Sequence, residues 1–316
     1  MKTKYIQGKM FTPDEIALKD DALHKKDRFT HIETWYYDAV FDNNYSIVCL
    51  INHFKIGRLG LILAGLFIYR DGVLIESERK KFFQKHFFGS DDAPLIKIKN
   101  KEIIRGMQDK KTGNWIYFIS MGDKKLGFDL QFETTTKGWS GKTYLGNWLA
   151  IPRYKVTGNL FVQGKNVNVT GTGYHDHNIY PFSTPLKNKG YIFGKITEEP
   201  VTITWAEVIK NIHKRLPIVV INNENEYFSI PIEDIKFNVV NQMKDNGKVI
   251  PKTICLQVKN KQVDIDITMD LIQFHRISMP AFNYWRYHLK NTGKITVDST
   301  SKIINHVEIA EYLKFF

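Results

Sequence analysis

Hydrophobic and polar residues alternate along most of the chain after residue 30. Residues 128–133 place two phenylalanines and a leucine on one side and two acids and an amide on the other, and residues 263–271 keep the alternation longest. A repeat of two puts successive side chains on opposite faces of a β-strand. The pattern therefore predicts half-buried strands through most of the sequence.

Turn signals separate these strands at short intervals. Asp42-Asn43-Asn44 divides residues 35–41 from residues 45–51, and Asp71-Gly72 ends the apolar stretch at residues 61–69. Such turns between alternating stretches predict hairpins, and many hairpins in series predict a meandering antiparallel barrel or sandwich. Residues 206–216 fit either a helix or a continuation of the strand before them. The expected fold class is all-β.

A loop at residues 181–190, with two prolines and several polar residues, divides the strands into two series. The length of 316 residues also favours two domains. We expect an N-terminal domain at residues 1–180, in which residues 1–30 form a polar lead-in arm. A C-terminal domain is expected at residues 181–316.

The charge and the cysteines limit the partners and the compartment. Lys and Arg outnumber Asp and Glu by 45 to 33, but the lysines are scattered and form no long basic run, so we expect no nucleic-acid partner. A transient contact with an anionic membrane surface is compatible with this charge. Only Cys49 and Cys255 are present, which predicts a reducing, cytoplasmic location. We expect no signal peptide and no transmembrane helix.

The stretch Tyr174-His175-Asp176-His177-Asn178 has the highest density of reactive side chains. Alternation places His175 and His177 on one face of a strand and the other three residues on the opposite face. Gly171 and Gly173 precede it on the same strand. Glycine weakens a strand unless a bulge, a tight bend or a closely approaching ligand needs the space.

Three interpretations of this stretch compete. His-x-His could hold a metal ion with a third ligand, but the sequence does not choose among His31, His53, His275 and His288, so we assign no metal and no cofactor. Alternatively, an Asp in an apolar cavity has a raised pKa and serves as a general acid. The third interpretation is a buried polar network that only fixes the barrel.

Two further groups add candidates. Glu33 and Asp38 are five residues apart and so face opposite sides of one strand, which means that only one of them can point inward. Residues 284–288 combine three aromatic rings with Arg286 and a histidine, which suits a pocket mouth or an interface. No phosphate-binding glycine loop, nucleophile elbow or His-Glu-x-x-His motif is present, which disfavours nucleotide-dependent enzymes and serine hydrolases.

Residues 171–178, Gly-Thr-Gly-Tyr-His-Asp-His-Asn, resemble the Gly-x-Gly-Tyr-His-Asp-His-Asn-Trp-Gly signature of the carotenoid 1,2-hydratase (hydroxyneurosporene synthase) and AttH-like family. Residues 31–38, 148–160 and 287–313 resemble other segments of that family. The resemblance implies two tandem lipocalin-like domains. It also implies that Asp176 is an acid that protonates a double bond, with His175 and His177 tuning or orienting it.

The family includes hydratases of isoprenoid double bonds, fungal cyclases and a lipid-handling carrier. The chain departs from its pattern at three places: Ile179-Tyr180 replaces Trp-Gly, residues 191–194 replace Trp-x-Trp-Gly, and Thr34 stands beside a single Trp35. Indole faces stabilise cations, so these losses count against a carotenoid substrate.

From these residues and the family resemblance we expect a protein that binds a hydrophobic, isoprenoid or lipid-like, small molecule and hydrates, isomerises or cyclises it. The alternative is a lipid carrier without catalysis. The expected catalytic residues are Asp176, His175 and His177. The expected ligand-binding residues are Tyr174, Asn178, Glu33, Trp35, Tyr37, Trp205, Tyr284, Trp285 and Arg286.

Overall fold

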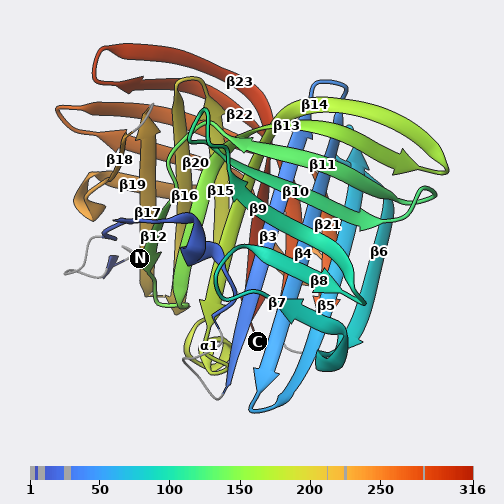
Figure 1. Cartoon of the computed structure of the whole chain (residues 1–316). Coiled ribbons are helices and arrows are strands. Elements are labelled where there is room, and N and C mark those ends of the chain that lie inside the picture. Colours follow the sequence, from blue (N-terminus) through green and yellow to red (C-terminus); the bar gives the residue numbers. More distant parts are fainter. Residues whose placement is uncertain are drawn as a thin grey trace. The chain divides into compact units, whose positions relative to one another are not determined.

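The computed structural model describes residues 4–5, 11–24, 30–211, 213–223, 226–279 and 282–315. It is built almost entirely of β-strands, in two curled antiparallel sheets that form a near-closed barrel and a half-barrel (Figure 1). The predicted all-β fold of two barrel-type domains is confirmed. The chain divides into unit 1, residues 1–13 and 183–316, and unit 2, residues 14–182.

Unit 2 contains the 13-stranded sheet, whose main strand order is β6-β5-β4-β3-β14-β13-β11-β10-β9-β8-β7. Most neighbours in this order are also neighbours in sequence, as hairpins require. The exceptions are β14, which returns to pair with β3, and β13, which pairs with β11 while β12 lies off the main order. The elements of unit 2 are β2 (Asp14–Glu15), η1 (Leu18–Asp21), β3 (Thr30–Phe41), β4 (Tyr45–Ile56), β5 (Leu59–Arg70), β6 (Val73–Phe83), η2 (Gln84–His86), β7 (Phe87–Gly89), β8 (Leu95–Ile98), β9 (Lys101–Gln108), β10 (Trp115–Gly122), β11 (Gly127–Thr134), β12 (Trp139–Lys142), β13 (Asn147–Val162) and β14 (Lys165–Tyr180).

Unit 1 contains the 10-stranded sheet in the order β1-β17-β16-β15-β23-β22-β21-β20-β19, with β18 paired to β17. Its elements are β1 (Lys4–Tyr5), α1 (Thr184–Lys187), β15 (Gly190–Glu198), β16 (Val201–Asn211), β17 (Lys214–Asn223), β18 (Glu226–Ser229), η3 (Ile232–Asp234), β19 (Ile235–Asp245), β20 (Lys248–Lys259), β21 (Val263–Met279), β22 (Phe282–Val297) and β23 (Thr300–Phe315). Residues 206–211 continue β16 and residues 214–216 begin β17, so the strand is the correct possibility for these residues, while residue 212 lies outside the described residues.

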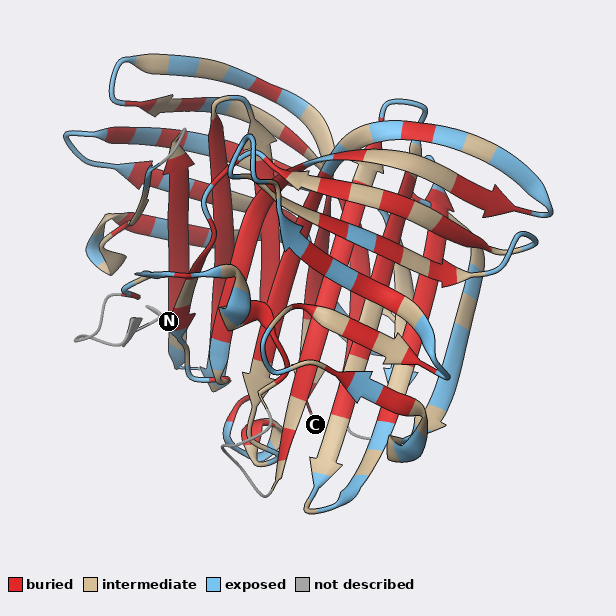
Figure 2. Ribbon diagram, in the orientation of Figure 1, coloured by how far each residue is buried: buried red, intermediate tan, exposed pale blue. Residues whose placement is uncertain are grey.

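Burial follows the alternation that the sequence predicted. Phe128, Leu130 and Phe132 of β11 are buried in the core of unit 2, while the residues between them are half-buried. Figure 2 shows buried residues along the long strands and exposed residues at their turns. Cys49 and Cys255 are both free, and Cys49 packs in the core of unit 2. No helix among the described residues is long and apolar enough to cross a membrane.

Two local features of unit 2 lie close to the motif stretch. The pairing of β13 with β14 shifts between Ile151 and Tyr154, and Pro152, which has no N–H to donate, lies within this bulge. On β14, a side chain at Gly171 would collide with the backbone of Val40 in β3. At Gly173 it would collide with side chains of the core. Protein atoms already fill this space, so tight packing rather than a ligand explains both glycines.

Candidate functional site

The motif stretch lies on β14, between β13 and β3. In the register of β3 and β14, Asp176 is opposite Tyr36 and His177 is opposite Trp35. The imidazoles of His175 and His177 point to the inner face of unit 2, and Asp176 points to the other face, as alternation predicted. The two halves of the motif therefore belong to two separate clusters.

On the inner face, Asp21 joins the two histidines. One oxygen of its carboxylate accepts a hydrogen bond from His175 Nε2 at 3.0 Å and the other is 2.9 Å from His177 Nδ1. The other nitrogen of His175 lies 2.9 Å from the carbonyl oxygen of Tyr36. Asp21 is fully buried at the end of η1, so part of the predicted lead-in arm lies inside the unit.

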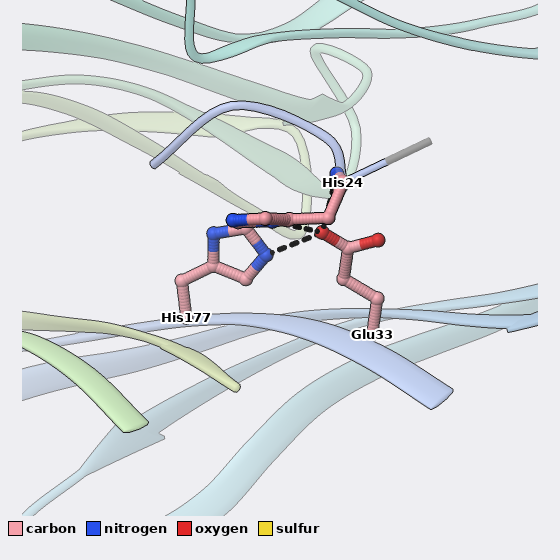
Figure 3. A group of neighbouring side chains, drawn as sticks. All are labelled: His24, Glu33 and His177. Atoms are coloured by element: carbon pink, nitrogen blue, oxygen red, sulfur yellow. Dashed lines mark hydrogen bonds and ion pairs between the residues drawn. The ribbon is translucent and has the colours of Figure 1, made fainter. Parts of the chain in front are cut away.

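Glu33 extends this network on the same face. Its Oε1 is 2.8 Å from His177 Nε2 and 2.9 Å from His24 Nδ1, and it also accepts the backbone N–H of His24. Both imidazoles approach this one oxygen, while the second oxygen of Glu33 points away from them (Figure 3). All four ring nitrogens of the His-x-His pair are thus hydrogen-bonded, which accounts for the pair without a shared metal ion.

Aromatic rings hold the histidines in place. Tyr37 stacks on His175 with ring centroids 3.9 Å apart and planes 8° apart, and Trp35 lies 4.5 Å from the ring of His177. The structure therefore brings Glu33, Trp35 and Tyr37, three of the expected ligand-binding residues, around the histidines. All three are buried.

The carboxylates and imidazoles of this network shift one another's pKa values. Burial would raise the pKa of Asp21 and of Glu33, but their histidine partners outweigh burial and hold both well below the usual carboxyl range. Burial would lower the pKa of His177, yet its hydrogen bonds to Asp21 and Glu33 raise it to about 9. At neutral pH an imidazolium therefore bridges two carboxylates.

A cavity of about 300 Å³ lies beside this network. Its polar wall includes His24, His31 and His53, and its apolar wall includes Leu23 and Phe87. His53 Nε2 is 2.7 Å from Gln84 Oε1, and burial lowers the pKa of the His53 imidazole. This volume is at the lower end of the range for small-molecule pockets.

On the other face of β14, Asp176 is the centre of a second polar cluster. Tyr174 Oη donates to its Oδ2 at 3.1 Å, and Asn178 Nδ2 donates to its Oδ1 at 2.6 Å. Trp148 Nε1 donates in turn to Tyr174 Oη. The Asp176 side chain is 7% exposed.

A second carboxylate lies on this face. Asp38 of β3 is opposite Tyr174 in the register and accepts a hydrogen bond from Tyr36 at 3.0 Å. Burial raises the pKa of Tyr174, and the nearby carboxylates of Asp176 and Asp38 raise it further. Glu33 and Asp38 thus face opposite sides of β3, as their spacing predicted.

The remaining expected ligand-binding residues lie in unit 1. Trp205 and Trp285 are packed in its core, the first against Phe237 and the second against Tyr312. Tyr284 and Arg286 lie on the other face of β22. There Arg286 Nη2 donates to Tyr284 Oη at 3.1 Å, and Tyr284 Oη donates to Glu311. A ligand role for these four residues stays a prediction.

The sequence pattern did not identify Asp21 or His24. Both lie in a stretch without periodicity, and Asp21 is 154 residues away from His175 along the chain. The one local signal is Ala22-Leu23, a buried apolar pair that packs this end of the arm into the unit. Such a pair predicts burial but does not indicate which strand its neighbours contact.

Comparison with known proteins places the chain by its fold. No known family pattern matches the sequence, and no characterised protein sequence matches it. Among solved structures, an AttH-like protein from Nitrosomonas europaea superposes with a TM-score of 0.68 at 11% identity, covering 96% of this chain and 98% of that one. The chain shares the fold of that protein.

Two further solved proteins have similar structures. Kievitone hydratase from Nectria haematococca superposes with a TM-score of 0.55 at 11% identity, covering 90% of this chain and 88% of its own. CghA, in its structure with Sch210972, superposes with a TM-score of 0.62 at 9% identity, covering 91% and 89%. At this identity the likeness establishes a common fold and carries no residue assignment.

Proposed function

We propose that this chain is an acid–base enzyme that adds water to, isomerises or cyclises an apolar small molecule, with Asp176 as the general acid. The observation that carries the proposal is the anchoring of the Asp176 carboxylate. Both of its oxygens accept hydrogen bonds, from Tyr174 and Asn178, and a second acid, Asp38, borders the same tyrosine. Two neighbouring carboxyl groups do not readily ionise together, so such a pair can keep the proton that a general acid donates.

The chemistry follows from this arrangement. Asp176 donates its proton to one carbon of a double bond, and the other carbon becomes a cation. In a hydration, water adds to that cation and the proton it releases returns to the carboxylate, so the net reaction is alkene plus water giving an alcohol. Tyr174 orients the donor, because its hydroxyl bonds one oxygen of the carboxylate.

His175 and His177 enter the proposal in a changed role. The sequence suggested that they tune or orient Asp176, but they turn to the opposite face and bind Asp21. We propose that they act as positioning residues, which hold β14 against β3 and so fix the strand that carries the acid.

The comparisons support the reaction class without determining the substrate. A protein with this fold is named a hydratase, and another, CghA, has been crystallised with Sch210972. The resemblance of residues 171–178 to the carotenoid hydratase signature favours an isoprenoid or a similar apolar substrate. We further propose a cytoplasmic location, since only two cysteines are present and both are free.

The test uses the full chain and a panel of isoprenoid and prenylated aromatic compounds in ¹⁸O-labelled water. A hydratase incorporates one labelled oxygen into its product, which mass spectrometry detects. Asp176→Asn keeps the shape of the side chain and its bond to Tyr174 but removes the acidic proton. We expect this variant to bind the substrate and to lose turnover by a factor of at least about 10².

Asp266→Asn, on an exposed face of β21, is the matched control and should behave as the unchanged protein. Full turnover by Asp176→Asn would refute the assignment of the acid.

The second candidate is a carrier, and the cavity of about 300 Å³ beside the histidines favours it. A carrier would bind a compound of the panel in a defined ratio and release it unlabelled and unchanged. That result, with no turnover of any compound, would replace the enzyme proposal.

A further inference from the structure

Three buried polar atoms close to the cavity make no well-formed hydrogen bond among the described residues: His31 Nε2 and Glu33 Oε2, which face each other at 3.5 Å as a long ion pair, and His53 Nδ1. Their side chains are 3%, 0% and 2% exposed. An unsatisfied buried polar group costs about 1–3 kcal/mol. Three such atoms in one place therefore require an explanation.

We propose that His31, Glu33 and His53 bind a divalent transition-metal ion, with Zn²⁺ as the best match. One ligand atom of each residue lies within 4.8 Å of those of the other two, and His31 Nε2 is 3.5 Å from Glu33 Oε2. Ligands about 2.0–2.1 Å from one zinc ion are roughly 3.4 Å apart in a tetrahedron, so small side-chain rotations complete the site. Two imidazoles and one carboxylate are also a ligand set that zinc enzymes use.

The strand register brings these residues together. Glu33 of β3 is directly opposite His53 of β4, and His31 is two residues before Glu33 on the same face. Neighbouring side chains on one face of paired strands are within about 5–8 Å of each other at their Cβ atoms. The three ligands thus sit on rigid strands rather than on a loop.

The surrounding contacts orient the ligands as metal sites require. The Nε2–H of His53 donates to Gln84 Oε1 at 2.7 Å, which leaves the lone pair of Nδ1 available. A side chain at Gly60 would collide with Gln84 Oε1, so the glycine makes room for this bond. Glu33 is held by its other oxygen, which accepts from His24 and His177.

The neighbouring group of His24, Glu33 and His177 is a weaker candidate, although its ligand atoms are equally close. Both nitrogens of His177 already bond carboxylates, and Glu33 Oε1 accepts three hydrogen bonds (Figure 3). A metal ion there would have to displace these bonds. The group of His31, Glu33 and His53, whose hydrogen bonds are incomplete, is therefore the better site for an ion.

The cavity gives this site an open coordination position. His31 and His53 line it, and Lys55 and the half-exposed Phe88 border it toward solvent. Three protein ligands with one free position are typical of zinc sites that bind water or a small oxygen ligand. The inference is independent of the proposed acid, since Asp176 lies on the other face of β14.

The test is metal binding by the full chain after removal of metals with a chelator. Titration with Co²⁺, which gives strong visible absorption in four- or five-coordinate sites, is followed by competition with Zn²⁺. We expect one equivalent of Co²⁺ with intense bands, displaced by one equivalent of Zn²⁺. His53→Phe and, separately, His31→Phe should lower the affinity by more than 100-fold, and Gln84→Leu by roughly 10-fold, as loss of an orienting partner does.

His306→Ala, a partly exposed histidine of unit 1 beside Glu198 and Glu308, is the control for surface binding and should change nothing. Circular dichroism identifies any variant that fails to fold, and the cobalt spectrum of the unchanged protein decides the question in that case. Weak, pale binding of Co²⁺, or binding that both phenylalanine variants retain, would overturn the proposal.

Discussion

Loss of the Asp21 carboxylate should lower the stability of unit 2, and the variant Asp21→Asn tests this. The side chain is fully buried and bonds two histidines on β14. The substitution keeps the shape but removes the negative charge. One histidine can still donate to the amide oxygen, whereas the amide nitrogen faces the other imidazole as a competing donor. An imidazolium is then left in a buried site with one anion fewer.

The stability lost in Asp21→Asn can be worked out in two ways. Removing one partner of a buried ion pair costs about 3–5 kcal/mol. The pKa of His177 rises from 6.5 to about 9 because its anionic partners outweigh burial, and at about 1.4 kcal/mol per pH unit this net rise favours the imidazolium by roughly 3.5 kcal/mol. Because Glu33 remains in the variant, we expect a loss of about 3 kcal/mol.

Hydrogen–deuterium exchange measured on peptides is the suitable assay, because it localises the loss in a chain of two units. A loss of about 3 kcal/mol raises the exchange rate of amides in β3 and β14 by roughly 100-fold. Asp14→Asn, an exposed acid on the same arm, is the control and should leave these rates unchanged. If Asp21→Asn exchanges at the rate of the control, the carboxylate does not hold the strands and the reasoning fails.

Three further predictions concern other parts of the chain. Burial lowers the pKa of His288 to about 3, so between pH 6.5 and pH 3 the imidazole takes up a proton only in the unfolded chain. The free energy of unfolding, measured by urea titration, should therefore fall as the pH is lowered over this range. In His288→Gln this fall should be shallower. Gly171→Ala should cost about 1–3 kcal/mol in the same assay because the methyl group meets the carbonyl of Val40, and an unchanged urea midpoint would contradict this. Tyr174→Phe should lower kcat roughly 10-fold or more with little change in KM, because loss of the tyrosine hydroxyl frees the carboxyl group of Asp176 to rotate. Steady-state kinetics measure both constants, and a change in KM alone would contradict an orienting role for Tyr174.

The fold could be predicted from the sequence because alternation and turns are local signals. Residues 263–271, the longest alternating stretch, fall within β21, and the Asp42-Asn43-Asn44 turn joins β3 to β4. The faces of β14 were also predictable, since a strand has only two. Residues 206–216 remained ambiguous between helix and strand because their pattern lacks a clean period. Pairing with β15 and β17 decided for strands there.

The residues that form hydrogen bonds with His175 and His177 could not be predicted in the same way. Alternation predicts that His175 and His177 share a face, but the residue that they bind, Asp21, comes from an arm without periodicity. His31 and His53 were two of four candidate ligands in the sequence. Only the register of β3 with β4 places His53 opposite Glu33 and so separates these two from the others.

The most direct test of the account is mass spectrometry of the apolar compound that co-purifies with the full chain and with Asp176→Asn, both produced in the same cells. If Asp176 protonates a double bond for hydration, the variant retains the substrate and the unchanged protein retains the alcohol, heavier by one water molecule. A rearranged isomer in place of the alcohol would assign isomerisation or cyclisation to the same acid. The same unmodified compound in both preparations would contradict the central claim and indicate a carrier.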